Sequence, residues 1–198
     1  MRVGFFNEAS RADRSARPQA PRPPWVAPPG NELPAALPAP IVLVRTAHTV
    51  VALTEALIYS VGIEFTVTGR IRMAEMPDRW PLSMFRGGYP SNGPLPDDVL
   101  RFGFQLADGF KLTNLDSQVG RHDPATQPQH PVMRPTRPAA ENGNGPGRYD
   151  FRLWMWPLPP AGPLTMVCEW PGRDIPETRV KLDGAALLAA AKDVVKLW

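Results

Sequence analysis

Proline is the feature that most limits what this chain can fold into. The 26 prolines are grouped: nine lie in residues 7–40, five in 73–98, six in 117–148 and six in 157–176. Proline breaks helices and inner strands because it lacks a backbone donor and has a fixed φ. A share of about 13%, against a usual share of about 5%, excludes a helical bundle, a coiled coil and a long doubly wound sheet. Regular structure must therefore lie between the proline groups.

The segments between the prolines alternate between apolar and polar residues. In residues 63–72, for example, Ile63, Phe65 and Val67 point to one side, while Glu64 and Thr66 point to the other. This period of two is typical of a strand with one buried face. On this basis the sequence predicts strands at 41–45, 48–53, 63–72, 100–106, 110–114, 149–156, 164–170 and 177–182.

The links between these strands indicate how they pair. The dipeptide Asp108-Gly109 separates two alternating runs and predicts a hairpin whose two central residues both have positive φ. The proline-rich link 157–163 suggests that 149–156 and 164–170 are antiparallel partners. About eight strands with turn-rich links predict a mainly β protein, an antiparallel β-sandwich.

One helix is predicted, at the C-terminal end of the sequence. Asp183 is a favourable N-cap, and an alanine- and leucine-rich run follows it. The predicted helix covers 184–198. Its apolar stripe comprises Leu187, Leu188, Ala191, Val194, Val195 and Trp198. We expect this stripe to pack on a sheet, with partner binding as the alternative.

The proline groups also predict the domain organisation. Residues 1–40 form a proline-rich N-terminal arm, partly disordered, whose second half docks through Trp25, Val26 and Leu33. Residues 41–198 form a single β-sandwich domain. Its two long loops, 73–98 and 117–148, exceed the usual loop length.

Charge and targeting signals narrow the choice of partners. The net charge is +3, and residues 1–40 and 117–149 each carry an excess of two arginines over acidic residues. Only four lysines occur, and no run of basic residues. We therefore do not expect nucleic-acid binding, although weak association through these arginine-bearing segments is an alternative. No secretory signal or apolar run of membrane-spanning length is present, so we expect a cytoplasmic protein that does not bind a membrane.

The only cysteine, Cys168, excludes an intrachain disulfide. It lies on the apolar face of its strand, where a cysteine behaves as a small buried hydrophobe. His122, Asp123 and His130 share one loop, but their spacing matches no metal-ligand motif. No nucleophile elbow or phosphate-binding loop occurs. We expect no catalytic residues, no metal and no cofactor.

Carboxylates near tryptophans are the remaining candidates for a binding site. They could bind a sugar or a cation, or act as a glycosidic acid and base, whereas solvated ion pairs are the simpler interpretation. The candidate residues are Trp154, Trp156, Trp170, Asp150, Glu169 and Glu177. If the three carboxylates share a pocket, a catalytic site is favoured; if they are scattered over the sheet, they are solvated surface charges.

Several motifs resemble a family of actinobacterial proteins. They are W-M-W-P-L-P-P-A-G-P-L at 154–164, C-E-W-P at 168–171 and I-P-E-T at 175–178, with weaker similarity at 24–34, 62–66, 107–109 and 113–116. The chain departs from that family in 117–148, where relatives tend to be glycine-rich. The family is uncharacterised, so the resemblance implies no activity, cofactor or partner.

The sequence therefore favours a non-catalytic binding or protein-interaction module, with another protein or a second copy of the chain as partner. A hydrolase-like enzyme using Asp150, Glu169 or Glu177 is the alternative.

Overall fold

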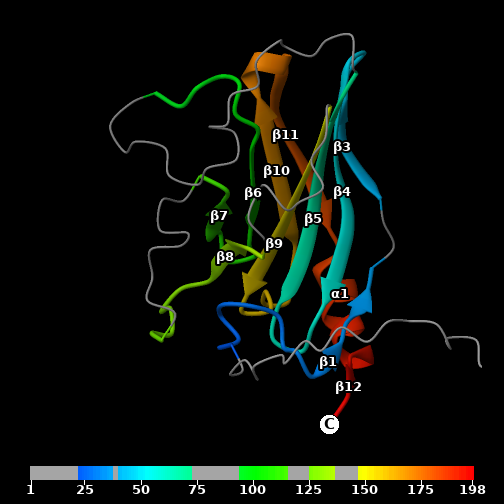
Figure 1. Ribbon diagram of the computed structural model, residues 1–198, viewed down its shortest axis with the longest axis vertical. Coiled ribbons are helices and arrows are strands. Elements are labelled where there is room, and N and C mark those ends of the chain that lie inside the picture. The colour runs from blue at the N-terminus through cyan, green and yellow to red at the C-terminus, as the bar shows by residue number, and fades with distance from the viewer. Residues whose placement is uncertain (1–21, 38–39, 73–93, 116–124, 137–146) are drawn as a thin grey trace, which may run out of the picture.

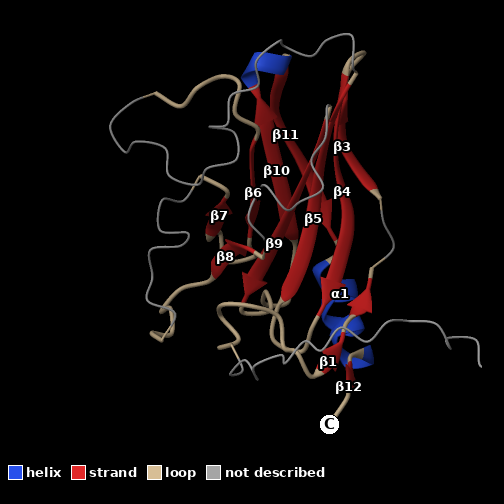
Figure 2. Cartoon of the chain, in the orientation of Figure 1, coloured by secondary structure: helices blue, strands red, loops and turns tan. Residues whose placement is uncertain are grey.

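The protein is a mainly β sandwich of two antiparallel sheets, as the alternation predicted (Figure 1). The computed structural model describes residues 22–37, 40–72, 94–115, 125–136 and 147–198. Strands dominate this part of the chain, and a short helix lies near the C-terminal end (Figure 2).

The larger sheet has six strands in the order β2-β4-β5-β9-β8, and β3 also pairs with β4. All of these pairs are antiparallel. The strands are β2 (Ala35–Ala36), β3 (Ile41–Arg45), β4 (Thr49–Ile58), β5 (Ile63–Ile71), β8 (Val132–Pro135) and β9 (Arg148–Trp156).

The smaller sheet has four strands in the order β11-β10-β6-β7. They are β6 (Arg101–Gln105), β7 (Lys111–Thr113), β10 (Leu164–Trp170) and β11 (Ile175–Leu182). A single 3-10 turn, η4 (Pro171–Arg173), joins β10 to β11. A separate two-stranded ribbon pairs β1 (Glu32–Leu33) with β12 (Val195–Lys196).

The core lies between the two sheets and is built from the apolar face of each strand. Phe65 of β5 stacks on Phe104 of β6 with ring centroids 4.5 Å apart. Phe102 of β6 and Phe151 of β9 make a second contact between the sheets at 5.2 Å. Burial of this apolar surface is the main term that stabilises the sandwich.

The Asp108-Gly109 hairpin joins β6 to β7, as predicted, but its turn differs from the predicted one. Of these two residues only Gly109 has positive φ, at 88°. The Asp108 carboxylate accepts a hydrogen bond from the Phe110 amide at 2.9 Å, which stabilises the turn without positive φ at Asp108.

One strand end was predicted wrongly and one whole strand was missed, because local irregularities hide the alternation. Strand β4 continues to Ile58, whereas the prediction ended at Leu53. A β-bulge between Leu53 and Glu55 shifts the register there and reverses which residues face the core. Strand β8 lies inside the predicted loop 117–148. It is an edge strand, a position that tolerates Pro135.

The predicted pairing of 149–156 with 164–170 was wrong. Strand β9 pairs with β5 and β8, while β10 pairs with β6 and β11. The proline-rich link 157–163 therefore crosses from one sheet to the other instead of closing a hairpin. Proline-rich links do not specify sheet membership, because they carry no turn of defined hydrogen bonding.

The predicted helix 184–198 is much shorter than expected. Helix α1 spans Gly184–Ala190, one 3-10 turn η5 (Ala191–Asp193) follows, and β12 replaces the last predicted turn. Asp183 is the N-cap, accepting hydrogen bonds from the Ala185 and Ala186 amides at 2.9 and 3.2 Å. Leu187 is fully buried, but the rest of the stripe beyond η5 does not pack as a helix face.

Parts of the predicted arm and of both long loops lie outside the described residues. They are residues 1–21 and 38–39 of the arm, 73–93 of the first loop, and 116–124 and 137–146 of the second. Among the residues that the structure describes, no helix has both the length and the apolar character needed to span a membrane.

Candidate functional site

Two of the three candidate tryptophans lie on the outer face of the six-stranded sheet, where the N-terminal segment contacts them. Trp154 is fully buried, and its indole nitrogen donates to the carbonyl of Pro24 at 2.8 Å. Trp25 meets Trp156 edge to face, with ring centroids 6.0 Å apart. Tyr59 packs edge-on against Trp154 at 5.5 Å. These indoles are therefore engaged by the protein's own chain.

Asp150 lies on the same outer face and belongs to a hydrogen-bonded network. Its carboxylate accepts from Thr68 at 2.7 Å, from Arg70 at 2.8 Å and from Arg148 at 2.9 Å. Burial opposes ionisation, but these three donors outweigh it and lower the pKa of Asp150. A carboxylate so fully engaged supports the sheet and has little capacity left for a ligand.

Trp170 lies inside the sandwich and not beside the other two tryptophans. It is 1% exposed, and its indole nitrogen donates to the Asp98 carbonyl at 3.0 Å. The Arg173 guanidinium lies 5.9 Å from the ring centroid. Trp170 is therefore a core residue.

Glu169 and Glu177 line one groove on the outer face of the four-stranded sheet. The groove encloses about 210 Å³. Its walls come from all four strands of that sheet and from two flanking loops. The lining residues that face outward are Arg101, Gly103, Gln105, Lys111, Thr113, Val167, Glu169, Glu177 and Arg179, with Leu95 and Leu115 at the sides.

The acidic side chains of this groove are paired with arginines. Arg101 donates to Glu169 at 2.6 Å. Arg179 donates to Glu177 at 2.8 Å and to the amide oxygen of Gln105 at 3.2 Å. Two carboxylates bound to separate arginines do not form the facing acid and base that glycoside hydrolysis requires.

Gly103 shapes the groove by letting β7 lie close against β6. A Cβ at this position would overlap the carbonyl oxygen of Leu112. The absence of that atom also leaves the centre of the groove without a side chain. Gly103 thus allows the close approach of the neighbouring strand.

The structure therefore brings Glu169 and Glu177 to one groove and leaves Asp150 on the other sheet. Sequence analysis missed the other lining residues, among them Gln105, Lys111 and Thr113. The hairpin contained the signal, because its register places Gln105 opposite Lys111 and Gly103 opposite Thr113. Those residues share the outward face of the paired strands.

Cys168 is 1% exposed and packs inside the sandwich. Burial raises the pKa of its thiol to about 11, so the reactive thiolate is scarce at neutral pH. Within the described ranges, histidine, cysteine and carboxylate side chains form no group of three that could bind a metal. His130 stacks on Phe110, with ring centroids 5.9 Å apart. His122 and Asp123 lie outside those ranges.

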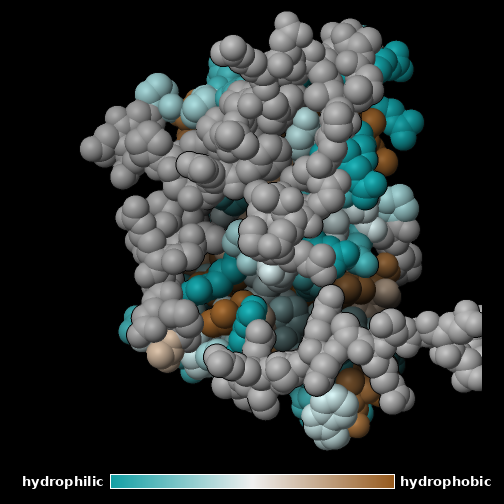
Figure 3. Space-filling view, in the orientation of Figure 1, coloured by the Kyte–Doolittle hydropathy of each residue, from teal (hydrophilic) through white to brown (hydrophobic). Residues whose placement is uncertain are grey.

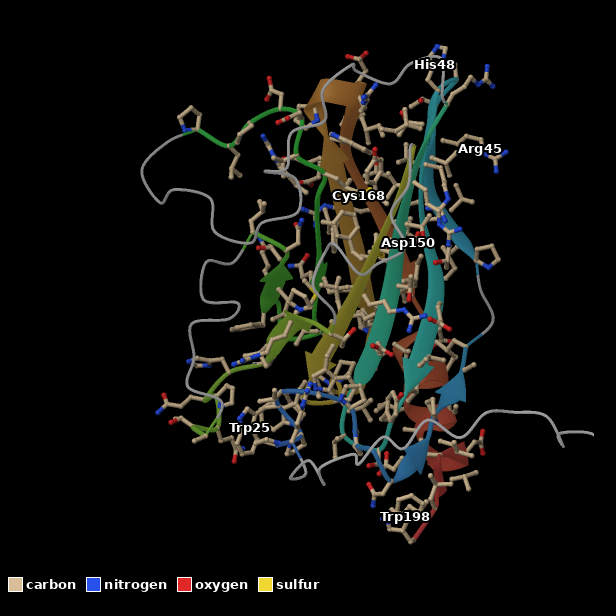
Figure 4. The ribbon with its side chains drawn as sticks, in the orientation of Figure 1. Trp25, Arg45, His48, Asp150, Cys168 and Trp198 are labelled. Atoms are coloured by element: carbon tan, nitrogen blue, oxygen red, sulfur yellow. The ribbon has the colours of Figure 1, made fainter. Side chains whose placement is uncertain are left out.

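A small apolar surface surrounds the β1–β12 ribbon. Leu33 and Val195 are directly opposite each other across the ribbon and are 52% and 54% exposed. Trp198, at the lower end in Figure 4, is 86% exposed, and apolar surface is visible at this end in Figure 3. Leu33, predicted as an anchor of the arm, thus faces outward instead.

Comparison with known proteins adds no further constraint: no protein-family model, curated protein or solved structure matches the chain. The geometry of these surfaces is therefore the basis for a functional conclusion.

Proposed function

We propose that this protein is a non-catalytic binding module whose site is the groove on the outer face of the four-stranded sheet. The observation that carries the proposal is the groove itself, an open concavity of about 210 Å³ with a small-residue centre at Gly103 and polar side chains around it. Ligand sites are concave surfaces in which a few polar groups fix the orientation of the ligand. The proposed location is the cytoplasm, where a free thiol such as Cys168 is usual.

A fragment screen by amide NMR, with a groove-filling variant, tests this proposal. Val167 lines the groove, whereas the outward-facing Lys181 lies on the edge strand β11, outside the groove lining. Small polar fragments are expected to shift the amide signals of Gly103 and Gln105. Val167→Trp should remove these shifts, and Lys181→Trp should retain them. Fragment shifts that survive Val167→Trp, or that gather on another surface, would overturn the assignment of the site.

The hydrolase alternative uses the same groove through Glu169 and Glu177. It is favoured by their common location and opposed by their separate arginine partners. Turnover of a panel of aryl glycosides that is abolished in Glu169→Gln and Glu177→Gln would replace the binding proposal with an enzymatic one.

A second candidate function is protein interaction at the β1–β12 ribbon. Among the described strands, β12 pairs with β1 alone, so its other edge is open beside the exposed Val195 and Leu197. These exposed apolar side chains provide roughly a few hundred Å² of surface. Each partner in a standard interface buries about 800 Å², which is more. The surface therefore fits a short extended segment of another protein that adds a strand, rather than a stable dimer.

A peptide selection tests this second candidate. Phage-displayed octapeptides selected on the wild type should be enriched in alternating apolar residues and should lose binding to a Leu33→Ser/Val195→Ser variant. Peptides that bind the variant equally would refute the assignment. If the wild type instead dimerises with increasing concentration and the variant does not, the partner at this surface is a second copy of the chain.

A further inference from the structure

The groove has an excess of hydrogen-bond donors at the end formed by β6 and β7. Gln105 and Lys111 are cross-strand neighbours there, and Thr113 follows on the same face. The amide oxygen of Gln105 already accepts from Arg179, which leaves its NH₂ group as a donor. Lys111 is exposed, and its ammonium forms no ion pair with any residue that the structure describes.

Among the described residues that line the groove, Lys111 is the only charged side chain without an ion-pair partner. Each lining glutamate is bound to its own arginine, Glu169 to Arg101 and Glu177 to Arg179. The lining residues therefore carry three cations and two anions. An anionic group beside Lys111 would complete this pattern and would also accept from the Gln105 amide.

Apolar side chains also line the groove, beside the arginine–glutamate pairs. Val167 lies on the face of β10, and Leu95 and Leu115 come from the flanking loops. The groove, with a volume of about 210 Å³, has room for one small organic molecule. Its occupant needs one anionic end and a short apolar body.

We propose that the groove binds a small aliphatic carboxylate, with the carboxylate on Lys111 and Gln105 and the hydrocarbon against Val167 and Leu115. This inference rests on the proposed binding function and specifies its ligand class. The carboxylate supplies the two acceptor oxygens that a lysine ammonium and an amide NH₂ can share. A groove of about 210 Å³ fits a short hydrocarbon chain.

Titration of the full chain with hexanoate, hexanol and hexylamine, followed by amide NMR, tests the inference. These probes share one hydrocarbon and differ in charge. Hexanoate is expected to shift the signals of Gly103, Gln105 and Val167, and to bind more tightly than the other two by about tenfold, the usual effect of a charge-assisted hydrogen bond. Equal binding of all three would refute the carboxylate but leave the groove as a binding site. Failure of all three to shift groove signals would overturn both proposals.

A matched pair of lysine variants locates the charge. Lys111→Gln should weaken hexanoate binding about tenfold and leave hexanol binding unchanged. Lys181→Gln is the control, because Lys181 lies at the far edge of the same sheet, outside the groove lining, and changes net charge equally. Equal weakening by the two variants would show a long-range charge effect and contradict the assigned contact. Amide spectra of both variants confirm that the fold is intact.

Discussion

The outer faces of the two sheets differ in what happens to their polar side chains. On the six-stranded sheet, Thr66, Thr68 and Asp150 are each less than one-tenth exposed, and hydrogen bonds join them to their neighbours. On the four-stranded sheet, Lys111 and Glu177 are exposed along an open groove. The strands alternate in the same way in both sheets, but the first outer face is structural and the second is accessible.

This difference teaches that alternation alone does not distinguish a solvated face from a covered one. A buried polar group is costly unless it is paired, and the six-stranded sheet meets that requirement through Thr68, Arg70 and Asp150. Substitutions on this face should therefore reduce stability, whereas those around the groove should change binding.

The largest effect is expected for Trp154→Ala. The side chain is fully buried and donates to Pro24, so its removal leaves a cavity and an unpaired carbonyl. The free energy of unfolding should fall by about 3–5 kcal/mol, measured by urea denaturation. Trp198→Ala is the control, because a side chain 86% exposed should change stability by no more than about 0.5 kcal/mol. Similar losses in the two variants would mean that the outer face is not part of the packed structure.

A smaller, pH-dependent effect is expected for Asp150→Asn. Because the folded-state pKa of Asp150 is lowered, its ionised form contributes stability above the unfolded pKa of about 3.9, and this contribution disappears as pH falls through the folded pKa. At pH 7 the loss should be about 2 kcal/mol.

Denaturation curves of wild type and Asp150→Asn, measured from neutral to acid pH, check this prediction. The two stabilities should converge in acid. A difference that is independent of pH would assign the loss to shape rather than to charge.

The smallest effect is expected for Glu177→Gln. Glu177 and its partner Arg179 are each about half exposed, at 54% and 49%. Water screens such a pair, so thermal denaturation should detect a change of only about 0.3 kcal/mol. A loss comparable to that of Asp150→Asn would erase the distinction between the two faces.

The sequence predicted the sandwich because its strands obey a period of two and its prolines lie between them. It did not reveal the bulge at Thr54 or the edge strand ending at Pro135, because both interrupt the local pattern that identifies strands. The C-terminal segment beyond Ala190 has helical spacing, yet pairing with β1 competes with the helix there. Local propensity cannot anticipate such a long-range contact.

The candidate site was only partly predictable for the same reason. Glu169 and Glu177 belong to adjacent strands that a short turn joins, so their common location follows from neighbouring sequence. Asp150 belongs to the other sheet, because the link 157–163 crosses from one sheet to the other. The local sequence did not predict this crossing. Lys111 is the groove cation that has no acidic partner among the described residues. This could not be predicted from the sequence, because it depends on which arginine pairs with each glutamate in the folded chain.

Thiol labelling of two variants, each with one added cysteine, tests the contrast between the outer faces most directly. Thr66→Cys introduces a thiol on the outer face of the six-stranded sheet, and Val167→Cys introduces one in the groove. The buried Cys168 serves as the unreactive background in both. With Ellman's reagent under native conditions, position 167 should react at least about tenfold faster than position 66, because a buried thiol must wait for local opening. Equal rates at the two positions would show that the outer faces of the two sheets are equally accessible, which contradicts the distinction between them.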